Sequence, residues 1–283
     1  MAQWFRRRFD DLARQSGRLP VAGVKLANAA HRFSLMGGGF SFDMSLNGER
    51  ALIRQCAQLH TSSRPLVAFD VGAHYGEWSA YLDSVMQTGR RLDGYLFEPT
   101  PVTFAALQRN VRTLKGRFRL NEVALAECAG TAPFDTYDGA GSVNTLVSSS
   151  SVHDGYLETI EIQMAVGDEY CASSGISHID LLKIDVEGAE MSVLQGFDSM
   201  LKGSAIGVIQ FEYGYGSGDA GSLMKDFYAF FEDHGYLVGP LRWNGVRFQE
   251  FGYGMNNFES GPNYVAALPS IAAGLSSFTV SAQ

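Results

Sequence analysis

The stretch that decides the fold is FDVGAHYGEW, residues 69–78. An apolar run leads into Asp70, glycines follow at Gly72 and Gly76, and a helical pattern begins directly afterwards. A short continuous apolar run is typical of a strand that is buried on both faces of a parallel sheet. Glycine is needed in the turn after such a strand, because a side chain would keep a ligand away from the backbone N–H groups. The stretch therefore predicts a buried strand, a ligand-binding turn and a helix in succession.

The alternation of strands and helices continues along the chain. Further strands are predicted at 93–99, 117–125, 178–188 and 205–214, and two last strands of antiparallel character at 236–241 and 262–268. Helices are predicted at 76–89, 100–116, 189–197 and 221–235, the second with Thr100 as its N-cap and Pro101 at its first position. Strands that alternate with helices in this way form a parallel sheet with right-handed crossovers. We therefore expect an α/β fold with a doubly wound, mostly parallel sheet.

Three segments depart from the alternation. Residues 1–60 are expected to form an N-terminal helical extension, 61–270 the main domain, and 271–283 a flexible tail. Within the main domain, patterns of period two at 130–138 and 158–166 flank a stretch rich in glycine and serine. These patterns predict a β-hairpin insertion with a mobile loop at its tip.

Composition and charge exclude several classes of protein. The 283 residues are 46% apolar and 18% charged with a formal net charge of −8, which argues against nucleic acid as the main partner. Three widely spaced cysteines, at 56, 128 and 171, favour a reduced, cytoplasmic protein. No apolar run is long enough for a transmembrane segment, and no apolar region of a secretory signal follows the arginines at 6–8. These arginines are expected to form the solvated face of a first helix, and weak contact with a membrane surface is the alternative. The oligomeric state is left open.

An acid closes each of the first two strands of the main domain. Asp70 stands where the nicotinamide-binding turn has its first glycine, and a carboxylate there would repel a pyrophosphate. Glu98 lies where an acid accepts the ribose hydroxyls in doubly wound folds. Together the two acids predict a nucleoside that has a cationic tail and no phosphates, a description that fits S-adenosylmethionine. The alternatives are a nicotinamide-dependent oxidoreductase and a non-catalytic module that has kept the fold.

Several blocks of the sequence resemble the FkbM family of methyltransferases. They are FDVGAHYGEWS, FEPTPVTFAALQRNV, NEVAL, IDLLKIDVEGAEMSVLQGF and IQFEYG, which together span roughly residues 65–215. KIDVEGAE, paired with FEP, is the specific part of the resemblance, and His74 departs from the middle glycine that is common in the wider class. The resemblance implies a Rossmann-like fold, S-adenosylmethionine as the methyl donor, and a hydroxyl of a sugar, glycoconjugate or secondary metabolite as the acceptor.

The resemblance also implies the roles of individual residues around the cofactor. Glu98 would hold the ribose, Pro99 would close the turn after it, and Asp185 would face the methyl group. Five residues would surround the methionine end: Asp70, Gly72, Ala73, His74 and Gly76. Three more, at the end of the third strand, would line the adenine pocket: Asn121, Glu122 and Val123.

Acidic residues at the ends of two later strands are the candidates for catalysis. Adjacent parallel strands end side by side, so Asp185 and Glu212 are expected within one ligand diameter of each other, with Glu187 close by. A carboxylate there could remove the proton of the acceptor hydroxyl, and His74 is a further candidate base. A divalent cation on Asp185 and Glu212 is the alternative, since it would lower the pKa of the hydroxyl. Glu190 is expected to cap the following helix.

Two further groups of residues are expected near these acids. Lys183, in the middle of its strand, is expected to pair with an acid. Aromatic and amide side chains close to the strand ends could recognise a small-molecule or carbohydrate acceptor by stacking and hydrogen bonding: Tyr213, Tyr215, Asn256 and Asn257.

Overall fold

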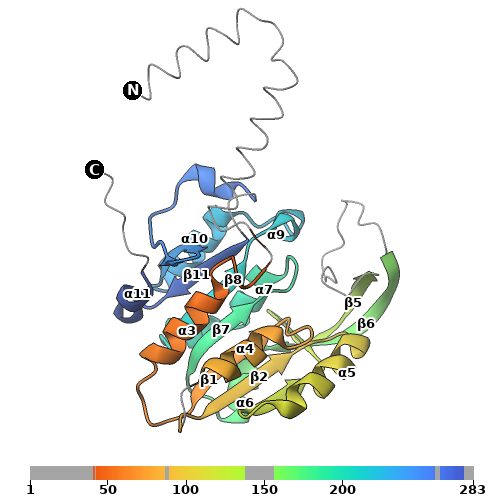
Figure 1. Cartoon of the computed structure of the whole chain (residues 1–283). Helices are drawn as coiled ribbons and strands as arrows, with labels where there is room; N and C mark the ends of the chain where they lie inside the picture. Colours follow the sequence, from red (N-terminus) through yellow and green to blue (C-terminus); the bar gives the residue numbers. More distant parts are fainter. Residues whose placement is uncertain (1–40, 42, 87–88, 138–155, 259–261, 277–283) are drawn as a thin grey trace, which may run out of the picture.

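The computed structural model describes residues 41, 43–86, 89–137, 156–258 and 262–276. Its centre is an eight-stranded sheet with the order β10-β9-β11-β8-β7-β1-β2-β3 (Figure 1). The strands are β1 (Leu66–Val71), β2 (Leu92–Phe97), β3 (Arg117–Asn121), β7 (Ile179–Ile184), β8 (Ile206–Glu212), β9 (Leu237–Arg242), β10 (Gly245–Val246) and β11 (Asn263–Ala267). The five strands from β3 to β8 are parallel, and β11 runs antiparallel to both β8 and β9. The predicted α/β class and the antiparallel ending are confirmed.

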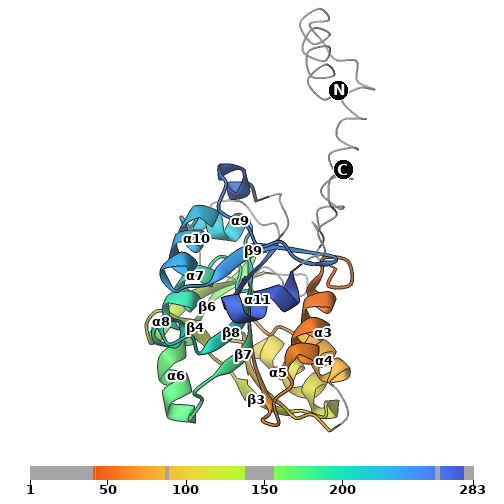
Figure 2. The ribbon, with the colours of Figure 1, turned by 90° about the vertical axis from the view of Figure 1, so that its left-hand side faces the viewer.

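Helices cover both faces of this sheet, as the edge-on view shows (Figure 2). One face carries α3 (Glu49–Leu59), α4 (Glu77–Val85), α5 (Pro101–Asn110) and α11 (Pro269–Leu275). The other face carries α6 (Gly167–Ser174), α7 (Glu190–Gln195), α8 (Asp198–Lys202) and α10 (Met224–Asp233). Each face packs on an apolar core, with Leu52 and Trp78 in the first core and Phe197 and Phe227 in the second. The predicted doubly wound arrangement of the sheet is therefore confirmed.

A second sheet holds the predicted hairpin. Its order is β4 (Ala124–Ala126), β6 (Tyr156–Val166) and β5 (Gly130–Tyr137), with β5 and β6 antiparallel. The loop at the tip of the hairpin, 138–155, lies outside the described residues, as do 1–40 with the basic arginines. Phe134 and Ile162 pack together beneath this small sheet and give it an apolar core of its own. The hairpin prediction is confirmed for the two strands.

Three boundaries and one capping contact differ from the prediction. The segment 117–125 divides, because the chain leaves the large sheet after Asn121 and joins the small sheet at Ala124. The helix predicted at 76–89 ends at Val85, and the helix predicted at 100–116 ends at Asn110 and continues as one 3₁₀ turn (Val111–Thr113). Thr100 lies at the N-cap of α5, but its side chain makes no capping hydrogen bond.

The predicted flexible tail is wrong at its start. Residues 269–275 form α11, whose Ala272 and Leu275 are buried against the core that α3 also covers. Pro269 at the first helical position and the apolar residues one turn apart explain this helix. Of the predicted N-terminal extension, the described part contains α3, which packs into the same core as α4 and α11. Among the described residues, no helix has both the length and the apolar character needed to span a membrane.

Three other short elements are found in the described part of the chain. They are α9 (Tyr215–Asp219), the 3₁₀ turn η2 (Tyr253–Asn256) and the small pair of β10 with β9.

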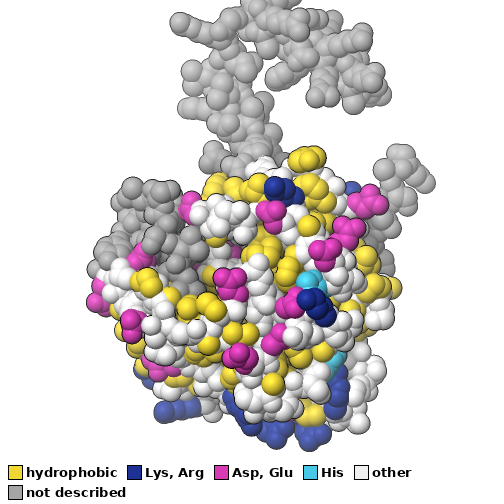
Figure 3. Space-filling view, turned by 180° about the vertical axis from the view of Figure 1, so that it is seen from behind, with side chains coloured by type: hydrophobic (Ala, Val, Ile, Leu, Met, Phe, Trp, Pro, Cys, Tyr) yellow, Lys and Arg dark blue, Asp and Glu magenta, His cyan; other side chains and the backbone are white. Residues whose placement is uncertain are grey.

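Lys and Arg side chains gather along the lower edge of the molecule in the space-filling view (Figure 3). Basic residues lie close to the starts of β1, β2 and β3: Arg64 is two residues before Leu66, Arg91 directly precedes Leu92, and Lys115 is two residues before Arg117.

At the amino-terminal end of β7, Asp180 connects several elements. Its carboxylate accepts two hydrogen bonds of 2.6 Å from Arg64 and one of 2.8 Å from the backbone amide of Val67, and it lies 3.3–3.4 Å from nitrogens of His178 and His60. Burial acts to raise the pKa of Asp180, but the hydrogen bonds from His178 and Arg64 outweigh it and lower the pKa well below the ordinary value.

We expect Asp180→Asn to destabilise the fold by about 1–3 kcal/mol at pH 7, because a charge-assisted group of hydrogen bonds is lost. The loss of stability should fall in the lower part of this range, because the Arg64 side chain is 43% exposed and solvent screens its attraction to Asp180. Because the folded pKa of Asp180 is lowered, its contribution is fully present above the unfolded pKa of about 3.9 and disappears as the pH falls through the folded value. Urea unfolding of parent and variant between pH 7 and pH 3 measures the difference, which should shrink toward the acid end. A difference that stays constant over this range would contradict the assignment.

Candidate active site

Strand register brings polar side chains together on the sheet face that α3 covers. Asp70 on β1 is level with Lys183 on β7, and Lys183 is level with Gln210 on β8. Side chains at the same level of neighbouring strands point to the same face, and so do residues two positions further along each strand. Asp185 and Glu212, which follow Lys183 and Gln210 by two residues, therefore lie on this face at the carboxyl ends of the strands.

The glycine turn after β1 is held between two neighbouring strands. Gly72 has a φ of 75°, and a Cβ atom built on it would lie 1.8 Å from the carbonyl oxygen of Asp185. The backbone amides of Gly72 and Ala73 both donate to the carbonyl of Phe97 at 3.0 Å, which ties the turn to β2. Gly76, with a φ of 84°, is the N-cap of α4. The turn thus brings backbone close to the ends of β2 and β7, where a larger residue than glycine would clash.

Glu98 lies at the carboxyl end of β2 with a fixed orientation. Its Oε2 accepts a hydrogen bond from the backbone amide of His74, and its Oε1 accepts one from that of Thr100, each at 3.0 Å. Burial raises the pKa of Glu98 above its ordinary value, although both of these bonds act to lower it. The two amides therefore hold the carboxylate at the wall of the cavity described below.

Asp70 lies beneath the glycine turn. Its side chain is 1% exposed, with Oδ2 accepting a 2.7 Å hydrogen bond from Ser79 and Oδ1 lying 3.4 Å from Nζ of Lys183. Burial raises the pKa of Asp70, and the charge of Lys183 acts in the opposite direction. Asp70 does not line the cavity, and its predicted contact with the cofactor stays a prediction.

Lys183 connects the two acids that flank it. Its ammonium group donates to the carbonyl of Gly72 at 3.2 Å and lies 3.2 Å from Oδ2 of Asp185 and 3.4 Å from Oδ1 of Asp70. Burial would lower the pKa of Lys183, but the charges of Asp185 and Asp70 outweigh it and raise the pKa. The predicted pairing of Lys183 with an acid is confirmed, and Lys183 stays protonated between two carboxylates.

Three carboxyl groups meet at the ends of β7 and β8. Asp185, Glu187 and Glu212 each offer an oxygen, and these oxygens all lie within 4.8 Å of one another. Burial acts to raise the pKa of Asp185, but Lys183 lowers it below the ordinary value. Burial and then the charge of Asp185 raise the pKa of Glu187 to about 8 and that of Glu212 well above its ordinary value. The cluster therefore holds its negative charge mainly on Asp185, while burial and the charge of Asp185 favour the protonated forms of Glu187 and Glu212.

Glu190 supports the loop between β7 and α7. Its Oε1 accepts the backbone amides of Val186 and Gly188 at 3.2 and 3.0 Å, and its Oε2 accepts the Ser217 hydroxyl at 3.3 Å. Burial raises the pKa of Glu190 to about 7, and the bond from Gly188 acts to lower it. Glu190 is predicted to cap the following helix, but the amides that it binds belong to the preceding loop, and the N-cap of α7 (Ala189) makes no side-chain capping hydrogen bond. Glu187, inside that loop, has a φ of 53°.

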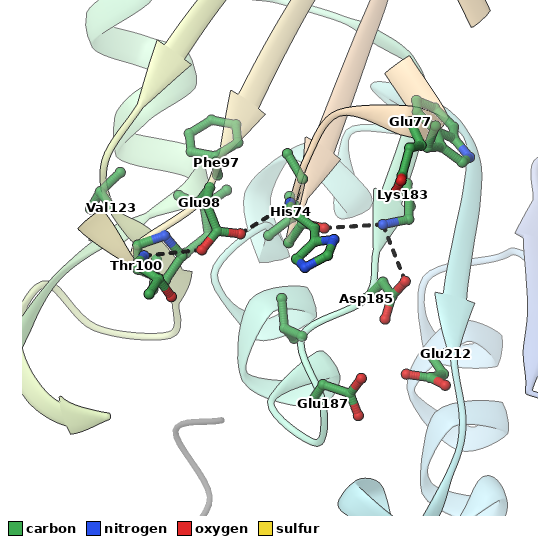
Figure 4. Close-up of a pocket in the computed structure, with 18 of the residues that line it drawn as sticks. His74, Glu77, Phe97, Glu98, Thr100, Val123, Lys183, Asp185, Glu187 and Glu212 are labelled. Carbon is green, nitrogen blue, oxygen red and sulfur yellow. Dashed lines mark hydrogen bonds and ion pairs between the residues drawn. The ribbon is translucent and has the colours of Figure 1, made fainter. Parts of the chain in front are cut away.

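Most of these groups line one cavity of about 390 Å³ (Figure 4). In the close-up, Glu98 and Val123 lie toward one end, Lys183 and Glu77 toward the other, and the His74 ring between them, with the carboxyl cluster below. Nine residues predicted for the site line the cavity: Gly72, Ala73, His74, Glu98, Pro99, Val123, Asp185, Glu187 and Glu212. Four do not: Asp70, Gly76, Asn121 and Glu122. Asn121 instead bonds the Leu96 carbonyl and the Tyr170 hydroxyl.

Sequence reasoning missed several residues of the cavity wall. They are Met44, Glu49, Glu77, Trp78, Thr100, Phe134 and Val186. Glu49 stands at the first position of α3, where an acid is ordinarily a favourable partner of the helix dipole, so nothing in the sequence singles it out. Phe134 is an inward-facing position of the alternating pattern in β5, and this alternation is the signal that could have identified it.

The predicted acceptor-recognition residues lie apart from the cavity wall. Tyr213 is fully buried and donates to the carbonyl of Asn256, whose side chain accepts the backbone amide of Lys225. Tyr215 is 63% exposed and its ring lies 5.6 Å from that of Phe258. Among the described residues, none of these side chains lines the cavity, so their proposed role in recognition is not supported.

Comparison with known proteins gives a consistent set of matches. The family model "Methyltransferase FkbM domain" matches residues 70–238. Hexuronic acid methyltransferase AglP of Haloferax volcanii is 24% identical over 64% of this chain and 70% of its own length. 2-O-methyltransferase NoeI of Sinorhizobium fredii is 27% identical over 50% of this chain and 61% of its own length. 31-O-demethyl-FK506 methyltransferase FkbM of Streptomyces tacrolimicus is 28% identical over 53% of this chain and 65% of its own length. The chain thus spans about three fifths to seven tenths of these relatives.

Proposed function

The chain belongs to the FkbM methyltransferase family, and from this we propose that it is an S-adenosylmethionine-dependent O-methyltransferase. The proposed acceptor is a hydroxyl of a sugar, glycoconjugate or secondary metabolite. The observation that carries the proposal is the position of Glu98 and Asp185 on the wall of one cavity, beside the same glycine turn. Relatives whose names specify a 2-O, a 31-O or a hexuronic acid methyltransferase support this class of acceptor.

The cavity fits the proposed cofactor at several points. Its volume of about 390 Å³ is in the range of small-molecule sites. Glu98 provides an ionisable carboxylate for the ribose hydroxyls, and Phe97, Val123 and Phe134 provide apolar surface for the adenine. Gly72, which has no side chain, lets the turn pack against the backbone of Asp185 at the cavity wall. The cofactor would supply a methyl group on a sulfonium, activated for transfer to a nucleophile.

Within this proposal Asp185 is the base. Lys183 keeps its carboxylate ionised, so Asp185 can accept the proton of the acceptor hydroxyl while the oxygen becomes methylated. Glu187 and Glu212, whose protonated forms are favoured, can donate hydrogen bonds to Asp185 or to the acceptor. The His74 imidazole lies between Glu98 and Asp185 and is placed to orient the acceptor (Figure 4).

A nicotinamide-dependent oxidoreductase is the competing interpretation of this fold. The pyrophosphate of a dinucleotide needs free backbone amides in the turn. Here the amides of Gly72 and Ala73 donate to Phe97, and that of His74 donates to Glu98.

Incubation with S-adenosylmethionine labelled in the methyl group, over a panel of hydroxylated sugars and secondary metabolites, tests the proposal. Transfer of label to an acceptor oxygen supports it, and reduction or oxidation of such compounds with NAD(H) but without label transfer would contradict it.

A divalent cation on the carboxyl cluster is the second mechanistic candidate, because oxygens of Asp185, Glu187 and Glu212 converge within 4.8 Å. Carboxylate oxygens are the ligands that Mg²⁺, Mn²⁺ and Ca²⁺ prefer. However, the ammonium group of Lys183 lies 3.2 Å from Asp185 and would repel a cation there. We therefore favour the metal-free mechanism.

We expect the methyl-transfer rate to stay within about twofold after dialysis against EDTA, because Lys183 already supplies the positive charge that holds Asp185 ionised. The measurement compares the rate in EDTA with the rate after readdition of Mg²⁺ or Mn²⁺. A rate that falls at least tenfold and is restored by one metal would assign the cluster to a cation.

A further inference from the structure

The N-terminal segment contributes a carboxylate to the cavity from outside the matched family domain. Glu49 and Met44 both line the cavity, whereas the family match begins at Asp70. Glu49 is the first residue of α3, and Gly48 before it has a φ of 98°. A Cβ atom on Gly48 would lie 2.3 Å from the carbonyl oxygen of Arg242. The start of α3 is therefore fixed against β9 at the carboxyl ends of the strands.

Neutral amide groups hold the Glu49 carboxylate in place. Oε2 accepts a hydrogen bond from Gln210 at 2.7 Å, and Oε1 accepts bonds from Asn47 at 2.5 Å and Asn263 at 3.4 Å. Trp78 in turn donates to the side-chain oxygen of Gln210 at 3.3 Å and fixes that amide. A carboxylate has about four acceptor positions, so the network leaves room for one further donor.

The negative charge of Glu49 has no direct counter-ion in the part of the chain that the structure describes. Among the described residues no ion pair within 4.0 Å involves Glu49; Lys183 lies against Asp70 and Asp185 and acts on Glu49 only through its charge. Glu49 is 9% exposed, and burial raises its pKa above the ordinary value. A buried carboxylate that is held only by neutral amides is expected to gain from a cationic group supplied by a ligand.

The proposed cofactor has such a group, the α-ammonium of its methionine tail. The sequence suggested Asp70 as the partner of this tail, but Asp70 lies beneath the turn and outside the cavity wall. Glu49 lines the wall, and its partner Gln210 is level with Lys183 on the neighbouring strand. In the close-up Lys183 lies away from Glu98, the proposed ribose ligand (Figure 4).

We infer that Glu49 binds the α-ammonium group of the cofactor's methionine tail, and this inference rests on the proposed function. The N-terminal segment thus contributes an acid to the cofactor site from outside the matched family domain. Glu77, an exposed acid at the start of α4, is the other wall carboxylate toward this end of the cavity and is the alternative that the experiment must separate.

The test compares two ligands that differ in the amino-acid tail. S-adenosylhomocysteine carries the α-ammonium group, and 5′-methylthioadenosine has the same nucleoside and thioether without the amino acid. Isothermal titration calorimetry measures both dissociation constants for the parent chain, Glu49→Gln, Glu49→Asp and Glu77→Gln. Asn47 and Gln210 are amides that can rotate to present either donor or acceptor, so Glu49→Gln can keep the network.

We expect Glu49→Gln to weaken the binding of S-adenosylhomocysteine by about 10- to 100-fold, the range of one hydrogen bond between charged groups. The binding of 5′-methylthioadenosine should weaken by less than about twofold. Glu49→Asp, which keeps the charge, should fall between parent and Glu49→Gln, and Glu77→Gln should bind both ligands like the parent. The inference is overturned if Glu49→Gln and Glu49→Asp lose affinity equally for both ligands, or if neither variant loses affinity for either ligand. It is also overturned if Glu77→Gln selectively loses affinity for S-adenosylhomocysteine. If the parent itself binds neither ligand, the proposed function fails as well, which separates the two outcomes.

Discussion

Asp185→Asn is expected to lower the rate of methyl transfer by about 10²- to 10⁴-fold, the usual contribution of a positioned general base. The asparagine keeps the size of the side chain and its hydrogen-bonding capacity toward Lys183, but it cannot accept the proton of the acceptor hydroxyl. Because Asp185 lies at the end of β7, away from Glu98, the dissociation constant of S-adenosylmethionine should change by only a few-fold. Single-turnover methyl transfer and calorimetric titration measure the two quantities separately.

Glu187→Gln is the matched control for this prediction. The pKa of Glu187 is raised to about 8 by burial and then by the charge of Asp185, so at pH 7 the carboxyl is mostly protonated and a glutamine resembles it. We expect the rate of this variant at pH 7 to remain within about threefold of the parent, far less than the loss in Asp185→Asn. Equal losses in both variants would contradict the assignment of Asp185 as the base and would favour a role for the cluster as a whole.

Glu98→Ala is expected to weaken the binding of S-adenosylmethionine by about 10²- to 10⁴-fold. Glu98 would accept two ribose hydroxyls, and each hydrogen bond to a charged group contributes about 1.5–3 kcal/mol. The truncation also leaves the backbone amides of His74 and Thr100 without their acceptor, which loosens the turn beside the cavity. Calorimetric titration with S-adenosylhomocysteine measures the effect.

Glu122→Ala provides a control on a nearby strand end. Glu122 is exposed and does not line the cavity, so its removal should leave the affinity within about twofold. A thermal unfolding curve for each variant shows whether the fold is retained. If folded Glu98→Ala binds as tightly as Glu122→Ala, Glu98 is not the ribose ligand.

The strand and helix pattern could be predicted because it depends on local sequence. Apolar runs such as that before Asp70, and helix starts such as Thr100-Pro101, are signals within a few residues of one another. Glu98 could also be placed correctly, because the ends of parallel strands meet at one edge of the sheet. The ends of strands and helices are harder to predict, because they depend on contacts with distant segments. The segment after Asn121 joins another sheet because it pairs with β6, about 40 positions further along the chain.

The surroundings of the acids could not be predicted in the same way. Whether Asp70 faces a ligand depends on Lys183 beside it, and this contact exists only because β1 and β7 pair in one register. Glu49 reaches the site through a contact with Gln210, a residue 161 positions away in the chain. Such contacts follow from packing between distant segments, and a single sequence does not record them.

The central claim is that the cavity between Glu98 and Asp185 is a site for S-adenosylmethionine. Calorimetric titration of the parent chain with S-adenosylhomocysteine, and separately with NAD⁺, tests it most directly. We expect stoichiometric binding of S-adenosylhomocysteine with a micromolar dissociation constant and no binding of NAD⁺ at the same concentrations. Binding of NAD⁺ without binding of S-adenosylhomocysteine would contradict it.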